Sequence, residues 1–94
     1  MNWIEADWPA PDFIKAGTTT RQGGVSHTPY DSFNLATHVG DEVDAVMQNR
    51  AMLTLPAEPQ WLEQVHSTDA VLLPSEESIL KADASFTSNT NTVC

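Results

Sequence analysis

The sequence is poor in several kinds of residue, and each shortage excludes a class of protein. One cysteine among 94 residues rules out an internal disulfide, and with it a disulfide-stapled fold. Lysine and arginine together number 4 against 13 acidic residues, which gives a formal net charge of −9. A surface of this charge repels phosphate backbones and anionic lipids, so neither nucleic acid nor a membrane surface is an expected partner.

Long apolar runs are also missing. The opening MNWIEADWPAPDF carries acids and prolines where a signal peptide has a basic start and an apolar core, and no later stretch has the length of a membrane span. We therefore expect a cytoplasmic protein with Cys94 as a reduced thiol. The hydrophobic fraction of 40%, with 3 Trp and 3 Phe, is that of a globular chain, and the length predicts one small domain with a thin core.

Glycine and proline divide the chain into predicted elements. Residues 13–20 mix apolar and β-branched side chains before Gly23 and Gly24, a pattern that predicts a strand ending in a glycine turn. The segment 21–40 is rich in turn formers and has no sustained period, which indicates a long loop, and such loops often carry function. Further strands are expected over residues 60–65, 70–73 and 82–87.

A single helix is predicted to begin at Asp41, whose side chain can cap it, and to end before Pro56. Its apolar residues are expected to share one buried face: Val43, Val46, Met47 and Leu53. One helix among several strands predicts the α+β class, with a mixed β-sheet and the helix packed on one face.

His66 is the first candidate for chemistry. It follows the apolar-edged run WLEQV, so we expect it near a strand end, where an imidazole can bind a metal or carry a proton. A hydrogen-bonded structural histidine is the alternative, because zinc needs three or four ligands. His27 and His38 lie in the long loop, and no H-x-x-H or C-x-x-C spacing joins any of these residues.

Arg21 and Asn34 are the candidate binding residues of the long loop. Arg21 stands between a strand and two glycines, where a guanidinium and backbone amides can hold a phosphate or carboxylate; the alternative is an arginine that pairs with one of the acids. Asn34 can bind a ligand or cap a turn. Asp83, in KADAS, is interpreted as a solvated or turn acid.

Several separated motifs resemble one known family. The strings TTTRQGGVSHTPYDSFNLATHVGD, WLEQVHS and KADASFTSNTNTVC, in this order, are similar to the YfiH-type family. The same family is called the laccase-domain or multicopper polyphenol oxidase family, and many members are described as purine nucleoside phosphorylases. The resemblance implies zinc bound by the histidine of a QVH motif, the cysteine of an ADC motif and the histidine of a HAGWRG motif.

Only the first of these zinc motifs has a match here. Gln64-Val65-His66 corresponds to QVH, so the resemblance implies that His66 is a metal ligand and a catalytic residue. Cys94 follows Thr-Val and not Ala-Asp, and the ligand role is not carried over to it. Ser67 stands where the family usually has glycine. The resemblance therefore predicts that residues 1–94 are the amino-terminal portion of a single YfiH-like laccase domain, truncated at the carboxyl end and with an incomplete YfiH-like fold.

The function implied by the resemblance is part of a zinc-dependent purine nucleoside phosphorylase that also deaminates adenosine. The fragment is expected to be inactive and not to hold zinc itself, and the substrates of the full-length protein are expected to be a purine nucleoside and phosphate. Copper is the alternative metal, in a polyphenol oxidase, although copper oxidases need several His and Cys ligands and the chain has 3 His and 1 Cys.

Two further functional interpretations stay open. One is an enzyme resembling a cysteine hydrolase. The other is a non-catalytic fragment that acts only by association. Val93-Cys94 resumes an apolar character at the end of the chain, which indicates a strand without its usual neighbours. Because open strand edges recruit partners, we expect either self-association or pairing with the missing carboxyl-terminal half.

Overall fold

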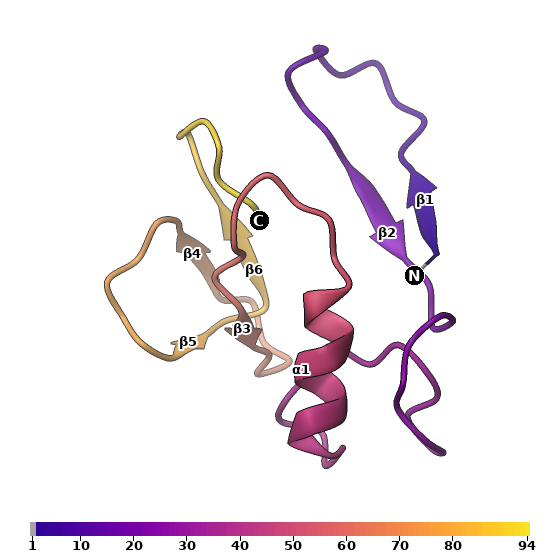
Figure 1. Cartoon of the computed structure of the whole chain (residues 1–94). Helices are drawn as coiled ribbons and strands as arrows, with labels where there is room; N and C mark the ends of the chain where they lie inside the picture. Colours follow the sequence, from indigo (N-terminus) through magenta and orange to yellow (C-terminus); the bar gives the residue numbers. More distant parts are fainter. Residues whose placement is uncertain (1) are drawn as a thin grey trace. The chain divides into compact units, whose positions relative to one another are not determined.

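The computed structural model describes residues 2–94, and these contain one helix and six short strands (Figure 1). The elements, in chain order, are β1 (Trp3–Glu5), β2 (Gly17–Thr19), α1 (Val43–Ala51), β3 (Leu62–Glu63), β4 (Ala70–Leu72), β5 (Leu80–Lys81) and β6 (Ala84–Phe86). The combination confirms the α+β class. The chain forms two compact units that meet in sequence after Leu53, and each is described by itself.

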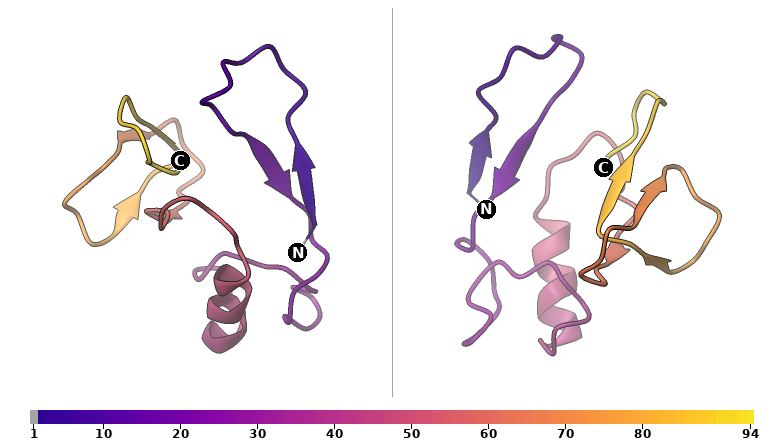
Figure 2. Two further views of the ribbon diagram at one scale, coloured as in Figure 1. Left: turned by 45° about the horizontal axis from the view of Figure 1, so that its top comes forward. Right: turned by 180° about the vertical axis from the view of Figure 1, so that it is seen from behind.

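The first unit opens with an antiparallel pair. β1 and β2 align Trp3 with Thr19 and Glu5 with Gly17, and a long connection joins them (Figures 1 and 2). The strand predicted over residues 13–20 is shorter than expected, because the Ile14 amide turns back to donate to the Pro11 carbonyl oxygen at 2.9 Å. β1 itself was not predicted, since its flanking acids and prolines are typical of a loop.

The predicted helix is present, but its expected apolar face is wrong. Within α1, Val46 is fully buried, while Val43 and Met47 are 60% and 52% exposed. The second buried side chain of the helix is polar, Asn49. The buried stripe of α1 is therefore narrow and half polar, which a pattern based on apolar spacing does not reveal.

The predicted helix cap is also wrong by one residue. Glu42 is the N-cap of α1 and makes no side-chain capping bond. Asp41 stands just before it. Its Oδ1 accepts from the Glu42 amide at 2.7 Å, and its Oδ2 accepts from the Ser26 hydroxyl at 2.6 Å and from Asn34 Nδ2 at 3.1 Å. Asp41 therefore joins the long loop to the start of the helix, because its loop partners are available only in the folded chain.

The second unit is built from two parallel strand pairs. β3 pairs with β5, with Leu62 opposite Leu80, and β4 pairs with β6, with Ala70 opposite Ala84. Leu73, Leu80 and Ala82 form its buried apolar core. The parallel and antiparallel pairs of the chain are thus distributed over three two-stranded sheets. β5 was not predicted, since the acidic and polar residues before it give no strand pattern.

Candidate functional site

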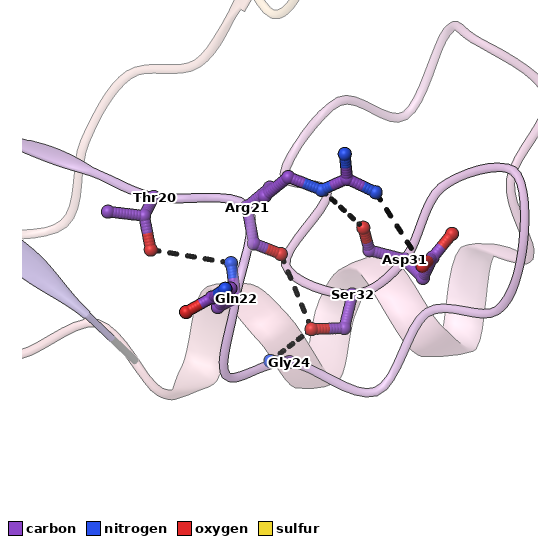
Figure 3. Close-up of polar contacts among 6 residues, drawn as sticks. All are labelled: Thr20, Arg21, Gln22, Gly24, Asp31 and Ser32. Atoms are coloured by element: carbon purple, nitrogen blue, oxygen red, sulfur yellow. Dashed lines mark hydrogen bonds and ion pairs between the residues drawn. The ribbon is translucent and has the colours of Figure 1, made fainter.

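The loop that starts at Arg21 is folded back on residues 31–33 (Figure 3). The Arg21 carbonyl oxygen accepts hydrogen bonds from the amides of Ser32 and Phe33, both 2.8 Å long. The Ser32 hydroxyl donates to the same carbonyl at 3.3 Å and accepts from the Gly24 amide at 3.2 Å. The Gly24 amide, one part of the anion cradle expected from the sequence, is therefore engaged inside the loop.

The guanidinium of Arg21 remains largely exposed. Its Nε donates to the Asp31 carbonyl oxygen at 3.3 Å, and a terminal nitrogen lies 3.6 Å from Asp31 Oδ2 (Figure 3). The two side chains are 75% and 47% exposed. An ion pair at this exposure contributes little to stability, so a phosphate or carboxylate can compete with Asp31 for the guanidinium. Arg21 can therefore pair with Asp31 in the free chain and still bind an anion, so both alternatives predicted from the sequence are compatible with its contacts.

Asn34 makes the contacts of a turn-forming side chain. Its Oδ1 accepts from the Ala36 amide at 3.1 Å, and its Nδ2 donates both to the Ala36 carbonyl oxygen and to Asp41 Oδ2, each at 3.1 Å. Both amide donors are engaged in these bonds. Direct contact between a ligand and the Asn34 amide donors would require the side chain to release Ala36 or Asp41.

Asn49 of α1 binds the long loop through its side-chain amide. This side chain is fully buried and makes three short hydrogen bonds: Oδ1 accepts from the Val25 amide at 2.8 Å, and Nδ2 donates to the Asn34 carbonyl oxygen at 2.8 Å and to the Ser26 hydroxyl at 2.9 Å. One amide thus joins both arms of the loop to the helix. The sequence offered no signal for this role, because an asparagine within a helix is ordinarily exposed.

Ser26 and Asp41 complete the same network. The hydrogen bond from Ser26 is the main cause that lowers the pKa of the Asp41 carboxyl from its ordinary value of 3.8; burial opposes this, and bonds from Asn34 and the Glu42 amide add to the lowering. The carboxylate is therefore ionised at neutral pH. An ionised acceptor suits the two donors, a hydroxyl and an amide, that meet at Oδ2.

His66 lies in the turn between β3 and β4, three residues beyond the end of β3. It is exposed, and its φ of 57° places it in the left-handed region, which few residues other than glycine adopt. Among residues 2–94 its imidazole makes no hydrogen bond or ion pair. The alternative prediction, a structural histidine held by hydrogen bonds, is therefore not supported by any contact of the ring within these residues. The ring is available to a ligand.

Asp83, interpreted from the sequence as a solvated or turn acid, organises this turn. Its carboxylate accepts from the amides of Val65 at 3.1 Å, Ser67 at 2.8 Å and Asp69 at 3.4 Å. Partial burial acts to raise the pKa of Asp83, but the amide hydrogen bonds, from Ser67, Asp69, His66 and Val65, outweigh it, so the pKa lies below 3.8. A carboxylate that accepts several backbone amides is the expected origin of such a shift.

Metal donors do not gather at His66 or at any other place in the described part of the chain. Residues 2–94 contain no group of three or more His, Cys, Asp or Glu side chains that could hold a metal ion. Cys94 is a free, exposed thiol. A shallow surface depression is formed by residues between Glu5 and Ala16, and it includes neither Arg21 nor His66. No helix within residues 2–94 has the length and apolarity needed to cross a bilayer.

A family described as multi-copper polyphenol oxidoreductase laccase matches residues 15–94. The chain belongs to this family. Among its curated relatives are purine nucleoside phosphorylases from Pseudomonas aeruginosa, 45% identical over 98% of the chain, and from Haemophilus influenzae, 48% identical over 100%. The Escherichia coli relative, named purine nucleoside phosphorylase YfiH, is 47% identical over 97% of the chain. These comparisons confirm the resemblance stated from the motifs.

The structural comparison agrees with the family assignment. A solved Neisseria meningitidis protein is 41% identical, with a TM-score of 0.81 over 98% of this laccase-family chain. The chain spans 39% of that protein, and 38% to 40% of the length of the three curated relatives. The residues matched in the relatives therefore account for about two fifths of each protein.

Proposed function

We propose that this chain supplies part of the active site of a purine nucleoside phosphorylase of the YfiH type. The names of the relatives support the reaction, and the observation that carries the role of this chain is the His66 turn, where an exposed imidazole stands on a backbone held by Asp83. In this proposal residues 1–94 form the amino-terminal portion of one YfiH-like domain, and a purine nucleoside and phosphate are the substrates.

Zinc is the proposed metal, with His66 as one of its ligands. An exposed imidazole on an ordered turn fits a single ligand position, but zinc takes three or four, and residues 2–94 offer no cluster of three donors. The remaining ligands would come from the part of a family member that this chain does not match. When bound, such a metal supplies an activated water, which also suits adenosine deamination. The 94-residue chain alone should then be inactive and should not retain zinc.

The residues of this chain have separate tasks in the proposed reaction. Arg21 binds the attacking phosphate, because its exposed guanidinium offers paired N–H donors and is held only by the surface contact with Asp31. Asn34 supports this site by shaping the loop that carries Arg21. His66 would be one ligand of the metal. A cytoplasmic location belongs to the same proposal, and the free thiol of Cys94 suits a reducing compartment.

A chimera provides the sharpest test. Residues 2–94 of this chain would replace the matched segment of the Haemophilus influenzae relative, and inosine phosphorolysis, adenosine deamination and zinc content would be measured beside the 94-residue chain alone. We expect turnover and zinc in the chimera and neither in the chain alone. A folded chimera that is inactive, while its parent is active, would contradict the proposal. Robust turnover by the metal-replete chain alone would contradict the need for further ligands.

Single variants of the chimera then assign the roles. His66→Ala should remove zinc and activity, whereas His38→Ala, another exposed histidine, should retain both. Arg21→Ala should raise the KM for phosphate about tenfold or more with little change in the KM for inosine, since a charge-assisted contact is lost. Lys15→Ala, an exposed cation of the same unit, serves as the control. An unchanged phosphate KM in Arg21→Ala would remove Arg21 from the site.

Copper-dependent oxidation of phenols is the second candidate, because the description of the matching family names it. The same chimera, loaded with copper in place of zinc, distinguishes the two reactions. Phenol oxidation that depends on His66, without inosine phosphorolysis, would favour the oxidase. Phosphorolysis in the zinc form without oxidation in the copper form would favour the phosphorylase.

We also propose that the β4–β6 pair is an association surface. Leu72 and Phe86 are neighbours in its register and are 55% and 54% exposed. Parallel strands are ordinarily covered on both faces, and a two-stranded sheet leaves an unpaired edge on each strand. A second copy of this chain or the remaining segment of a family member would cover these side chains.

A further inference from the structure

The turn that carries His66 interrupts a ladder of parallel strands. Strand β3 precedes the interruption and β4 follows it (Figure 1). Glu63 pairs with Lys81 before the interruption, and Ala70 pairs with Ala84 after it. Residues 64–69 on one segment are therefore opposed only by residues 82 and 83 on the other. The extra residues on the longer side leave the strand pairing as a loop, and such segments often carry functional side chains.

The Asp83 carboxylate holds this interruption from the shorter side. Oδ1 accepts from the Val65 amide at 3.1 Å, while Oδ2 accepts from the Ser67 amide at 2.8 Å and from the Asp69 amide at 3.4 Å. The shorter segment also donates to the turn: the Asp69 carbonyl oxygen accepts from the amides of Asp83 at 2.9 Å and Ala84 at 3.2 Å. The turn is thus anchored at its start, middle and end.

His66 lies between the two residues that the separate carboxylate oxygens bind. Its left-handed backbone, with φ of 57°, is unfavourable for a residue with a Cβ unless the surroundings impose it. The amide bonds from Val65 to Oδ1 and from Ser67 to Oδ2 fix the peptide groups near His66 on both sides. The His66 ring makes no bond within residues 2–94 that could fix the backbone instead.

We propose that Asp83 is a positioning residue for His66: its two carboxylate oxygens hold the turn around His66 in the left-handed conformation and so set the direction in which the exposed imidazole leaves the turn. The backbone fixes the direction of the His66 Cα–Cβ bond, and the ring itself makes no bond within residues 2–94. The proposal rests on the proposed function only in giving the imidazole a role as a metal ligand.

Nuclear magnetic resonance of the ¹⁵N-labelled 94-residue chain, without metal or substrate, tests this role. The measurements are amide hydrogen exchange at Val65 and Ser67 and the intraresidue amide–Hα Overhauser effect of His66, which is strong in a left-handed residue. Asp83→Ala should speed exchange at both amides by about fivefold or more and weaken the Overhauser effect. Protection of the Leu73 amide, bonded to the Phe86 carbonyl oxygen at 2.8 Å, reports that the unit is still folded.

The Asp83→Asn variant tests whether the turn needs two acceptor oxygens or only a side chain of this size. Asparagine has the same size but one acceptor oxygen, so protection should return at Val65 or at Ser67 and not at both. Asp69→Asn, in the same turn, is the control and should behave as the parent chain. An Asp83→Asn chain that matches the parent at both amides, or an unchanged Overhauser effect in Asp83→Ala, would overturn the proposal.

The possible outcomes remain distinct from those of the proposed function. If Asp83→Ala unfolds the unit and Leu73 loses its protection, the Asp83→Asn chain still decides between the two roles. No outcome depends on turnover, since neither metal nor nucleoside is present. An inactive chimera would therefore overturn the phosphorylase proposal without affecting the test of His66 positioning by Asp83.

Discussion

Replacing Asn49 by alanine tests whether one buried amide holds the loop of Arg21 and Asn34 in place. The substitution leaves the Val25 amide and the Asn34 carbonyl oxygen without their partner and opens space in a fully buried position. Each unsatisfied group costs roughly 1–3 kcal/mol, and both bonds are only partly buried, so water restores part of the loss. We expect the free energy of unfolding to fall by about 2–4 kcal/mol.

This loss is large against the stability of so short a chain. Small domains unfold with roughly 5–15 kcal/mol, so the variant should stay folded at low temperature, with its thermal midpoint lowered by roughly 10–20 °C. Urea unfolding followed by circular dichroism of α1 measures the change. Gln48→Ala, an exposed amide at the neighbouring helical position, is the matched control and should change stability by less than about 0.5 kcal/mol. Equal stability of the two variants would refute the anchoring role of Asn49.

Three further outcomes follow from particular contacts. Gly24→Ala should destabilise the chain by about 1–3 kcal/mol in urea unfolding, because a Cβ there would overlap the backbone of residues 32 and 33; an unchanged midpoint would contradict this close approach. Because the pKa values of Asp41 and Asp83 are lowered, the folded chain binds fewer protons than the unfolded chain in acid. The stability that these carboxylates contribute is fully present well above pH 3.8 and is lost as the pH falls below that value. Unfolding midpoints should show a smaller acid loss in Asp41→Asn than in the parent, and an identical pH profile would contradict the shift. Sedimentation should show that the parent chain self-associates and that the Phe86→Lys variant is more monomeric. Ile79→Lys, which also replaces an exposed apolar residue of the second unit, is the control and should associate as the parent does. A compact monomeric parent at micromolar concentration would count against the association surface.

Local pattern was sufficient for the main elements. The helix within residues 41–55 and the strands near 17–19, 62–63, 70–72 and 84–86 were all predicted from apolar spacing and turn residues. The motifs around Arg21 and His66 were sufficient for the family. β1 and β5 were missed because the acids, prolines and polar residues beside them give no local strand pattern, so that only pairing with β2 and β3 reveals them as strands.

The roles of the polar side chains depended on the folded chain. By itself the sequence determined the α+β class, the family and the turn that contains His66, because these follow from residue types and their order along the chain. Only the tertiary structure decided that Asn49 is buried under the long loop, that Asp41 bonds Ser26 and Asn34 instead of capping α1, and that Asp83 holds the His66 turn. The physical reason is that these hydrogen bonds join different segments of the chain, so folding and not local composition decides which groups meet.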